Sequence, residues 1–248
     1  MLGVLVALPW ELKTLTRRRL RPGTCSVIGD SITVALSGIG AERAHAAAAL
    51  LFSRGATGLL SWGCAGALDD RLSAGSVILP ACVIEDGGVT YAVDPGWHRE
   101  VYTPLSQRYP IQTGPVVETA GLIKSPAEKA KLGRRTGAIA TDMESAAHAR
   151  FAREHGLPFL ALRAVLDNAS IRLPPNVIDA LDGDGGISVF SFLRTFGLRP
   201  LEWIVFVKLG LQFHAARKTL KGTGAMVLRG SRDYLSRTSP EMPVASRR

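Results

Sequence analysis

The sequence contains little cysteine and no long uncharged apolar run. Its three cysteines, Cys25, Cys64 and Cys82, are odd in number and lack CxxC spacing, which argues against a disulfide framework and a structural zinc site. No segment approaches the roughly 18 to 20 apolar residues that span a bilayer. Residues Met1–Pro9 are not preceded by basic residues and have no leader-type cleavage site. We therefore expect a chain that works in a reducing, cytoplasmic setting.

The 248 residues are 46% hydrophobic and 21% charged, which excludes a chain disordered for lack of apolar surface. Short apolar runs alternate with segments typical of helices about a dozen residues long. This alternation predicts a single-domain, three-layer α/β/α fold with a mainly parallel, twisted central sheet. The expected strands include 3–8, 57–62, 76–84 and 159–166, the expected helices 41–54, 126–135 and 143–154, and the expected loop 86–110.

Positive charge is concentrated at the C-terminal end. From Arg194 onward there are eleven Lys or Arg residues against three acids, which accounts for eight of the nine net positive charges. We divide the chain into a main domain (1–186), amphipathic helices packed on it (187–221) and a basic, mobile tail (222–248). The basic segment is either a solvated face or an attraction to an anionic surface. Without a recognisable nucleic-acid module, we expect no nucleic-acid partner.

Two glycine-rich segments, Gly38-Ile-Gly40 and Gly63-Cys-Ala-Gly66, are predicted to be turns that present backbone N–H groups to a polar or anionic ligand. Arg43 replaces the third glycine of a dinucleotide fingerprint, so NAD is not expected. No cluster of His, Cys and Asp has metal-ligand spacing, and we predict neither a metal nor a cofactor.

Three carboxylates follow predicted strands. Glu11, Glu144 and Asp167 are expected to converge, because ligands of open α/β sheets bind where the strands end at their carboxyl edge. Any one of them taken alone is more readily explained as a cap or a surface acid.

Five spaced motifs carry a family resemblance. Glu11, Ser37–Gly40, Gly63–Leu68, Asp142–Ala147 and Arg163–Asp167 occur in an order that resembles the purine nucleoside phosphorylase and nucleosidase superfamily. Over residues 1–170 the sequence looks most like methylthioadenosine/S-adenosylhomocysteine nucleosidases. The Phe-rich, basic C-terminal extension resembles a narrower branch, the hopanoid-associated phosphorylases, which act on adenosylhopane.

The resemblance implies a role for each matching residue. Asp167 corresponds to the aspartate that protonates N7 of the purine, Glu144 to the glutamate that binds the ribose hydroxyls, and Glu11 to the carboxylate that activates water. Met143 corresponds to the methionine beneath the sugar. Cys64, Ala65 and Gly66 correspond to the segment that lines the nucleophile and sugar site, and Leu122 and Ile123 correspond to the residues that hold adenine.

The chemistry agrees with these roles. Cleavage of an N-glycosidic bond needs an acid at the base and a nucleophile on the other face of the sugar. Asp167 must then be protonated near neutral pH, which its apolar strand end favours. The sequence departs from the family at Leu166, which replaces a serine, so the bond that orients Asp167 is either lost or supplied elsewhere, by Asn168 or Ser170. Leu122 replaces an aromatic residue. Cys64 replaces a serine, and we interpret it as a small buried hydrophobic residue in preference to a reactive thiol.

We expect water as the nucleophile. Glu11 would repel phosphate in the first-strand loop, so hydrolysis is favoured over phosphorolysis. Phosphate stays open as a co-substrate, because Arg43, Arg71 or Arg163 could reach the site.

The expected reaction releases adenine from a 5′-substituted adenosine, in particular adenosylhopane in hopanoid lipid biosynthesis. The lipid would reach the site along an apolar path between Phe190 and Phe213, from an anionic membrane surface on the inner face of the membrane. The family resemblance also implies a homodimer. The alternatives are a soluble methylthioadenosine/S-adenosylhomocysteine nucleosidase and, from another class, a non-catalytic nucleoside-binding or membrane-docking module.

Overall fold

The computed structural model describes residues 1–172 and 200–238. The strands are β1 (Leu2–Val6), β2 (Thr24–Val27), β3 (Ile32–Leu36), β4 (Gly58–Ala67), β5 (Val77–Ile78), β6 (Cys82–Ile84), β7 (Thr90–Ala92), β8 (Ile111–Gln112), β9 (Val116–Glu118), β10 (Ala140–Asp142) and β11 (Phe159–Asp167). The helices are α1 (Pro9–Leu15), α2 (Ala41–Ser53), α3 (Pro95–Ser106), α4 (Pro126–Thr136), α5 (Ser145–Glu154) and α7 (Pro200–Thr238).

One mixed sheet forms the middle layer of the molecule. Its centre is parallel: β1 lies between β3 and β4, and β11 runs parallel to β4 on the other side. All five residues of β1 and nearly all of β11 are buried, as expected for strands covered on both faces. The expected three-layer α/β/α architecture with a largely parallel sheet is therefore confirmed.

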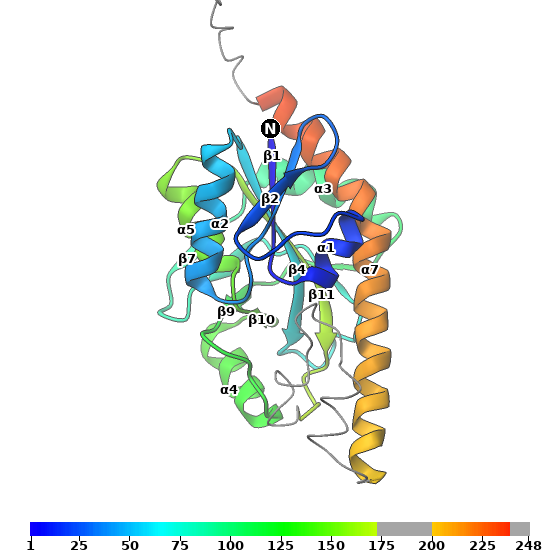
Figure 1. Cartoon of the computed structure of the whole chain (residues 1–248). Coiled ribbons are helices and arrows are strands. Elements are labelled where there is room, and N and C mark those ends of the chain that lie inside the picture. The colour runs from blue at the N-terminus through cyan, green and yellow to red at the C-terminus, as the bar shows by residue number, and fades with distance from the viewer. Residues whose placement is uncertain (173–199, 239–248) are drawn as a thin grey trace, which may run out of the picture.

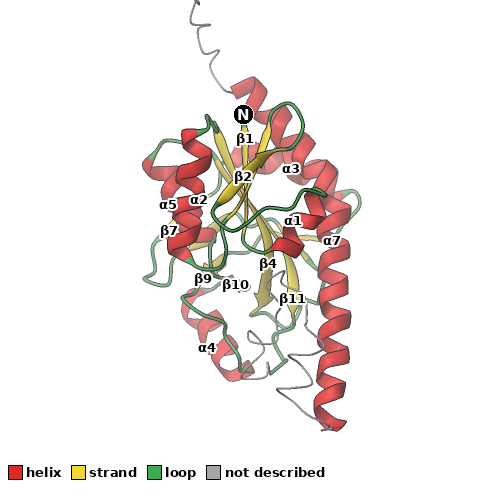
Figure 2. Ribbon diagram, in the orientation of Figure 1, coloured by secondary structure: helices red, strands yellow, loops and turns green. Residues whose placement is uncertain are grey.

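Helices cover both faces of the sheet (Figures 1 and 2). Helices α2 and α5 pack against each other and against the sheet on one side, while α1, α3 and α7 pack together on the other. The expected capping box of α4 is present: the Ser125 hydroxyl accepts a bond from Glu128 N, and the Glu128 carboxylate accepts one from Ser125 N.

The sheet branches along the long strand β4. Its first part pairs with β1 and β11, and its last residues, Gly66 and Ala67, pair with β10. Strands β10 and β11 therefore diverge from the same end of β4. Their last residues, Asp142 and Asp167, lie at this branch point together with the end of β4.

The expected turn at Gly63–Gly66 is wrong, because these residues continue β4 in register with β11. Gly63 lies opposite Arg163, and Cys64 lies opposite Ala164. The glycine is needed for close approach: a Cβ on Gly63 would lie 2.7 Å from Oε1 of Glu11. Gly38 and Gly40 do form the expected turn before α2, both with positive φ.

Two expectations about the rest of the chain also need correction. The predicted loop 86–110 contains β7 and α3; Asp94 caps α3 by accepting a bond from Trp97 N at 2.8 Å, and Pro95 begins the helix. Helix α7 continues to Thr238, so much of the segment expected as a mobile tail is helical. Trp97 and Tyr234 stack between α3 and α7, so this part of α7 packs on α3. The first part of the expected amphipathic segment, residues 187–199, lies outside the described residues.

Candidate active site

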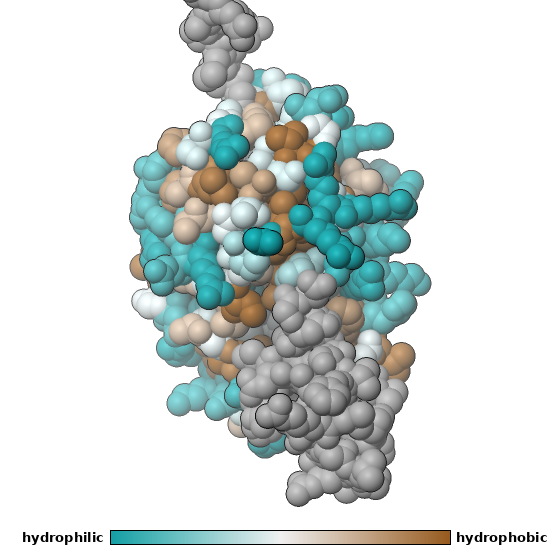
Figure 3. Space-filling model, viewed as in Figure 1, coloured by the Kyte–Doolittle hydropathy of each residue, from teal (hydrophilic) through white to brown (hydrophobic). Residues whose placement is uncertain are grey.

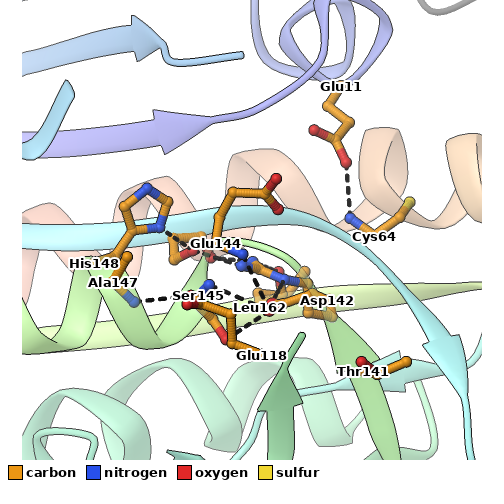
Figure 4. A network of polar contacts seen from close by, with 12 residues as sticks. Glu11, Cys64, Glu118, Thr141, Asp142, Glu144, Ser145, Ala147, His148 and Leu162 are labelled. Carbon is orange, nitrogen blue, oxygen red and sulfur yellow. Dashed lines mark hydrogen bonds and ion pairs between the residues drawn. The ribbon is translucent and has the colours of Figure 1, made fainter. Parts of the chain in front are cut away.

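Glu11 is held at the carboxyl end of β1 by two backbone donors. It is the third residue of α1 and only 3% exposed. Its Oε2 accepts a bond from Leu8 N at 3.0 Å, and its Oε1 accepts one from Cys64 N at 2.8 Å (Figure 4). Burial raises the pKa of Glu11 to about 7, although these backbone bonds and Arg163 act in the opposite direction. A carboxylate with this pKa can accept a proton from water near neutral pH.

Cys64 lies between two of the predicted carboxylates. It is half-buried and packs against the hydrophobic core. Burial, together with the charges of Glu11 and Asp167, raises the pKa of its thiol well above the usual value. Cys64 is therefore a neutral thiol, and both carboxylates lie within electrostatic range of it.

A buried network is centred on Arg163, and Figure 4 shows its members Asp142 and His148. Its Nε donates to Asp142 Oδ2 at 2.7 Å, and its remaining nitrogens donate to Ser61 O, Leu162 O and Ser61 Oγ. The Ser61 hydroxyl also contacts His148 Nδ1 at 2.8 Å. Burial and the Arg163 charge lower the pKa of His148 to about 3, so the imidazole is neutral. This network is a fixed support for the site.

Glu144 stands at the start of α5, where its Oε1 accepts a bond from Gly40 N at 2.9 Å. The glycine turn before α2 thus supplies one of its N–H groups to a predicted site residue. Figure 4 shows the Glu144 carboxylate on the side of the network towards Glu11 and Cys64. Burial and the neighbouring Asp142 raise the pKa of Glu144 to about 8. In its neutral form this carboxyl can both donate and accept hydrogen bonds, as ribose hydroxyls require.

An irregularity in strand pairing at the end of β11 sets the position of the Asp167 side chain. The register with β4 shifts between Val165 and Asp167, so that Asp167 lies opposite Gly66. A Cβ on Gly66 would lie 3.1 Å from Asp167 Oδ1, so the carboxylate occupies the space left by the missing side chain. Such bulges commonly redirect a side chain beside an active site. Here the residue passed over is Leu166.

Lys129 is the partner of Asp167. Its ammonium, 1% exposed, forms an ion pair with Asp167 Oδ2 and donates to Asn168 O at 2.9 Å. Burial raises the pKa of Asp167, and the charge of Lys129 lowers it in part. The expected orienting bond from Asn168 or Ser170 is therefore wrong: Asn168 contributes a backbone carbonyl to Lys129, and Ser170 is exposed.

The other predicted site residues are partly or fully buried. Met143 is half-buried between Asp142 and Glu144, and Ala65 is buried in β4. Leu122 and Ile123 are half-buried in the segment between β9 and α4. Ile123 packs on a small hydrophobic cluster of Leu68, Ile84, Val117, Leu132 and Ala138.

Two of the three arginines considered as phosphate ligands are paired with carboxylates. Arg163 is committed to Asp142 and Ser61. Arg71, whose side chain is 86% exposed, pairs with Asp69 at 2.6 Å. Arg43 lies against the glycine turn, with its Cδ 3.1 Å from where a Cβ on Gly38 would stand. Across residues 1–172 and 200–238, no three His, Cys, Asp or Glu side chains form a group that could hold a metal ion.

A separate groove of about 870 Å³ lies between α3 and α7. Its lining includes Arg99, Arg108, Arg229 and Arg237, and none of the predicted carboxylates. Figure 3 shows hydrophilic residues gathered along the edge of the molecule where α7 lies. The groove is therefore distinct from the site at the branch of the sheet.

Solved structures share this fold. Methylthioadenosine/S-adenosylhomocysteine nucleosidase from Neisseria meningitidis is 19% identical, with a TM-score of 0.67 over 94% of this chain and 99% of that one. The corresponding nucleosidase from Helicobacter pylori is 17% identical, with a TM-score of 0.67 over 94% and 98%. Futalosine hydrolase from Helicobacter pylori is 16% identical, with a TM-score of 0.66 over 94% and 97%.

Sequence comparison gives the family. No curated protein matches the chain by sequence. The model of the phosphorylase superfamily matches residues 2–182, which include β1, the branch of β4 and the carboxylates at the ends of β10 and β11. The chain therefore belongs to the phosphorylase superfamily.

Proposed function

We propose that the protein hydrolyses the N-glycosidic bond of an adenosine-like nucleoside. The observation that carries this proposal is the placement of Glu11 and Asp167 about the end of β4, both within electrostatic range of Cys64. Membership of the phosphorylase superfamily supports it. So does the fold shared with the two nucleosidases and the futalosine hydrolase.

Each carboxylate has a role that its surroundings favour. Asp167, buried and able to receive a proton, would protonate N7 of the purine as the bond to the sugar breaks. Glu144 would hold the ribose hydroxyls, with Gly40 N fixing one of its oxygens. Glu11, with a pKa of about 7, would take the proton of the attacking water.

Water is favoured over phosphate because Glu11 already occupies the backbone N–H donors at this position. Its two oxygens accept from Leu8 N and Cys64 N, the backbone donors that an anion bound here would use. A phosphate dianion would meet an anionic carboxylate in a buried place, where like charges repel strongly. The guanidinium of Arg163 is occupied by Asp142 and Ser61.

For the 5′ substituent we propose a bulky apolar group, in particular the hopane of adenosylhopane. Trp10 immediately precedes Glu11, and its ring lies 4.6 Å from that of Phe213 on α7. An apolar wall thus adjoins the residue that would activate water. Two residues before Phe213 on α7, Leu211 is 68% exposed. Phe190, at the other end of the proposed lipid path, lies outside the described residues.

The test is release of free adenine by the purified protein. Methylthioadenosine and a long-chain 5′-alkyl adenosine are each incubated with it, with and without inorganic phosphate. We expect adenine from the nucleoside regardless of phosphate, and faster turnover of the long-chain substrate. Strict dependence on phosphate would reverse the choice of nucleophile. Preference for methylthioadenosine would favour the soluble nucleosidase, and absence of adenine from every substrate would favour a non-catalytic binding module.

We propose that a basic face of α7 brings the protein to an anionic membrane surface as a homodimer. No helix of the described part of the chain is long and apolar enough to cross a membrane. Arg217, Lys218 and Lys221 are exposed on α7, where they could contact acidic headgroups. Size-exclusion chromatography tests the dimer.

Vesicle flotation tests the membrane contact. We expect binding to vesicles containing phosphatidylglycerol, and loss of binding when Arg217, Lys218 and Lys221 are changed to Glu. A matched variant reverses three exposed charges on other elements, at Arg54, Lys131 and Arg134, and should float as the wild type does. Equal flotation of both variants would contradict the contact.

A further inference from the structure

Lys129 is buried where a lysine is rarely found. Helix α4 is largely polar, and it buries only two of its residues, Lys129 and Leu132. The side chain of Lys129 is 1% exposed, whereas Lys131, two residues later on the same helix, is exposed. Lysine is almost never fully buried unless it is paired. The position of Lys129 therefore depends on the groups that its ammonium meets.

Those groups belong to the end of β11. The ammonium contacts the Asp167 carboxylate and donates to the carbonyl of Asn168 at 2.9 Å. Asp167 is itself 4% exposed and faces Gly66 on its other side. A second element, α4, thus supplies a proton donor to the carboxylate that the proposed reaction uses as an acid. Breaking such a buried pair leaves an uncompensated charge, so the two residues act together.

Resting on the proposed function, we infer that Lys129 is a positioning residue that acts through Asp167, holding the proton that Asp167 passes to the purine. In the resting pair the lysine carries the proton and the aspartate is ionised. When the base begins to leave, Nζ of Lys129 gives a proton to the Asp167 carboxylate, which passes a proton on to N7 and is ionised again at the end of the step.

The proton balance of this step closes. The electron pair of the breaking C1′–N bond goes to the purine, which takes a proton at N7 from Asp167. That proton reaches Asp167 from Lys129, which becomes a neutral amine and is recharged from solvent, so Asp167 begins and ends the step ionised. The attacking water forms the new bond to C1′ and loses its proton to Glu11. No oxidant, reductant or further reactant is needed.

Among the charged and titratable groups near Asp167, Lys129 acts most strongly on its carboxylate. From β4, the Cys64 thiol faces the carboxylate as a neutral group. At the exposed rim, Glu128 of α4 bonds to Ser125 and lies within electrostatic range of Arg172, which follows β11. The charge that acts directly on Asp167 is that of Lys129.

The experiment is a pH profile of adenine release by the full chain carrying Lys129→Met, with Lys131→Met as the matched control. In the wild type Asp167 and Lys129 together hold the transferable proton. Without Lys129 the proton resides on Asp167 alone, which loses it at lower pH. On the alkaline side of the profile, which we call the alkaline limb, we expect kcat to fall at a pH lower by at least about one unit, with KM little changed. Lys131→Met should leave the limb where it is in the wild type.

A second pair of variants guards against mere loss of packing. Asp167→Asn and the double variant Asp167→Asn, Lys129→Met should have equal kcat, because Lys129 acts through a group that is already absent. Thermal unfolding shows which variants fold. If Lys129→Met does not fold, Lys129→Arg takes its place in the test. Because this variant keeps the charge, its alkaline limb must stay at the wild-type pH or move to higher pH. An alkaline limb at the wild-type position in Lys129→Met, or a limb that moves down in Lys129→Arg, would overturn the inference. If the wild type itself releases no base, it is the proposed function that fails, and the inference falls with it.

Discussion

Glu11 lies where only a glycine at position 63 leaves it room. A Cβ on Gly63 would stand 2.7 Å from Glu11 Oε1, closer than real Cβ contacts come. Gly63 does not have a positive φ, so alanine can adopt its backbone conformation. The consequence of a side chain here is therefore displacement of the carboxylate.

The first prediction concerns Gly63→Ala. We expect kcat for adenine release to fall by about 10- to 100-fold, because a displacement of about 1 Å misaligns the group that activates water. The control is Gly87→Ala, at a position where a Cβ meets nothing within 4 Å. Adenine release is measured for both variants. Equal rates for Gly63→Ala and the control would show that the position of Glu11 does not matter to turnover.

The second prediction concerns the proton acceptor. Glu11→Gln keeps the size of the side chain but removes its basicity, so kcat should fall by about 10²- to 10⁴-fold. Because burial raises the pKa of Glu11 to about 7, the wild-type rate should rise with pH through about 7 as the carboxylate becomes ionised. Glu42→Gln, at an exposed position, serves as the control. A wild-type rate that stays level between pH 5 and 8 would argue against Glu11 as the base.

The sequence predicts the residues at the sheet edge better than it predicts how they are held. Carboxylates after strand ends, at Glu11 and Asp167, follow from the alternation of strands and helices. The register shift that turns Asp167 towards Gly66 depends on pairing between distant strands, and no local pattern marks it. Lys129 is less visible still, because a lysine on a polar helix ordinarily faces water. Its spacing of three residues from Leu132 is the only hint of a shared buried face.

The segment from Asp86 to Pro110 also has a structure that its local sequence does not predict. Gly96 and Pro104 are typical of loops, yet both lie within α3. The helix is stabilised from outside: Trp97 Nε1 donates to Ser231 Oγ of α7 at 2.9 Å, a contact across more than half the chain. Asp94 followed by Pro95 was the local signal that could have predicted its start.

The third prediction concerns stability against pH. The pKa of Glu144 is raised to about 8 from an ordinary value of 4.5, so the folded state holds a proton that the unfolded state releases. Its contribution to stability is fully present below pH 4.5 and is lost as pH rises through about 8. Glu144→Gln should therefore reduce the fall in Tm between pH 5 and 8.5. The exposed Glu42→Gln should leave this fall as it is in the wild type. A Glu144→Gln profile parallel to that of the wild type would contradict the raised pKa.

The fourth prediction separates support from chemistry in the Arg163 network. Asp142→Asn removes the charge that faces the Arg163 guanidinium in a pair whose side chains are 2% to 3% exposed. An unpaired buried charge should lower the free energy of unfolding by about 3 to 5 kcal/mol. Asp69→Asn breaks a similar contact with Arg71 on the surface, where solvent replaces the partner, and should change stability little. Urea denaturation measures both. Equal losses would mean that the buried pair contributes no more than the exposed one, and that Arg163 finds other partners among Ser61 and its neighbours when Asp142 is neutral.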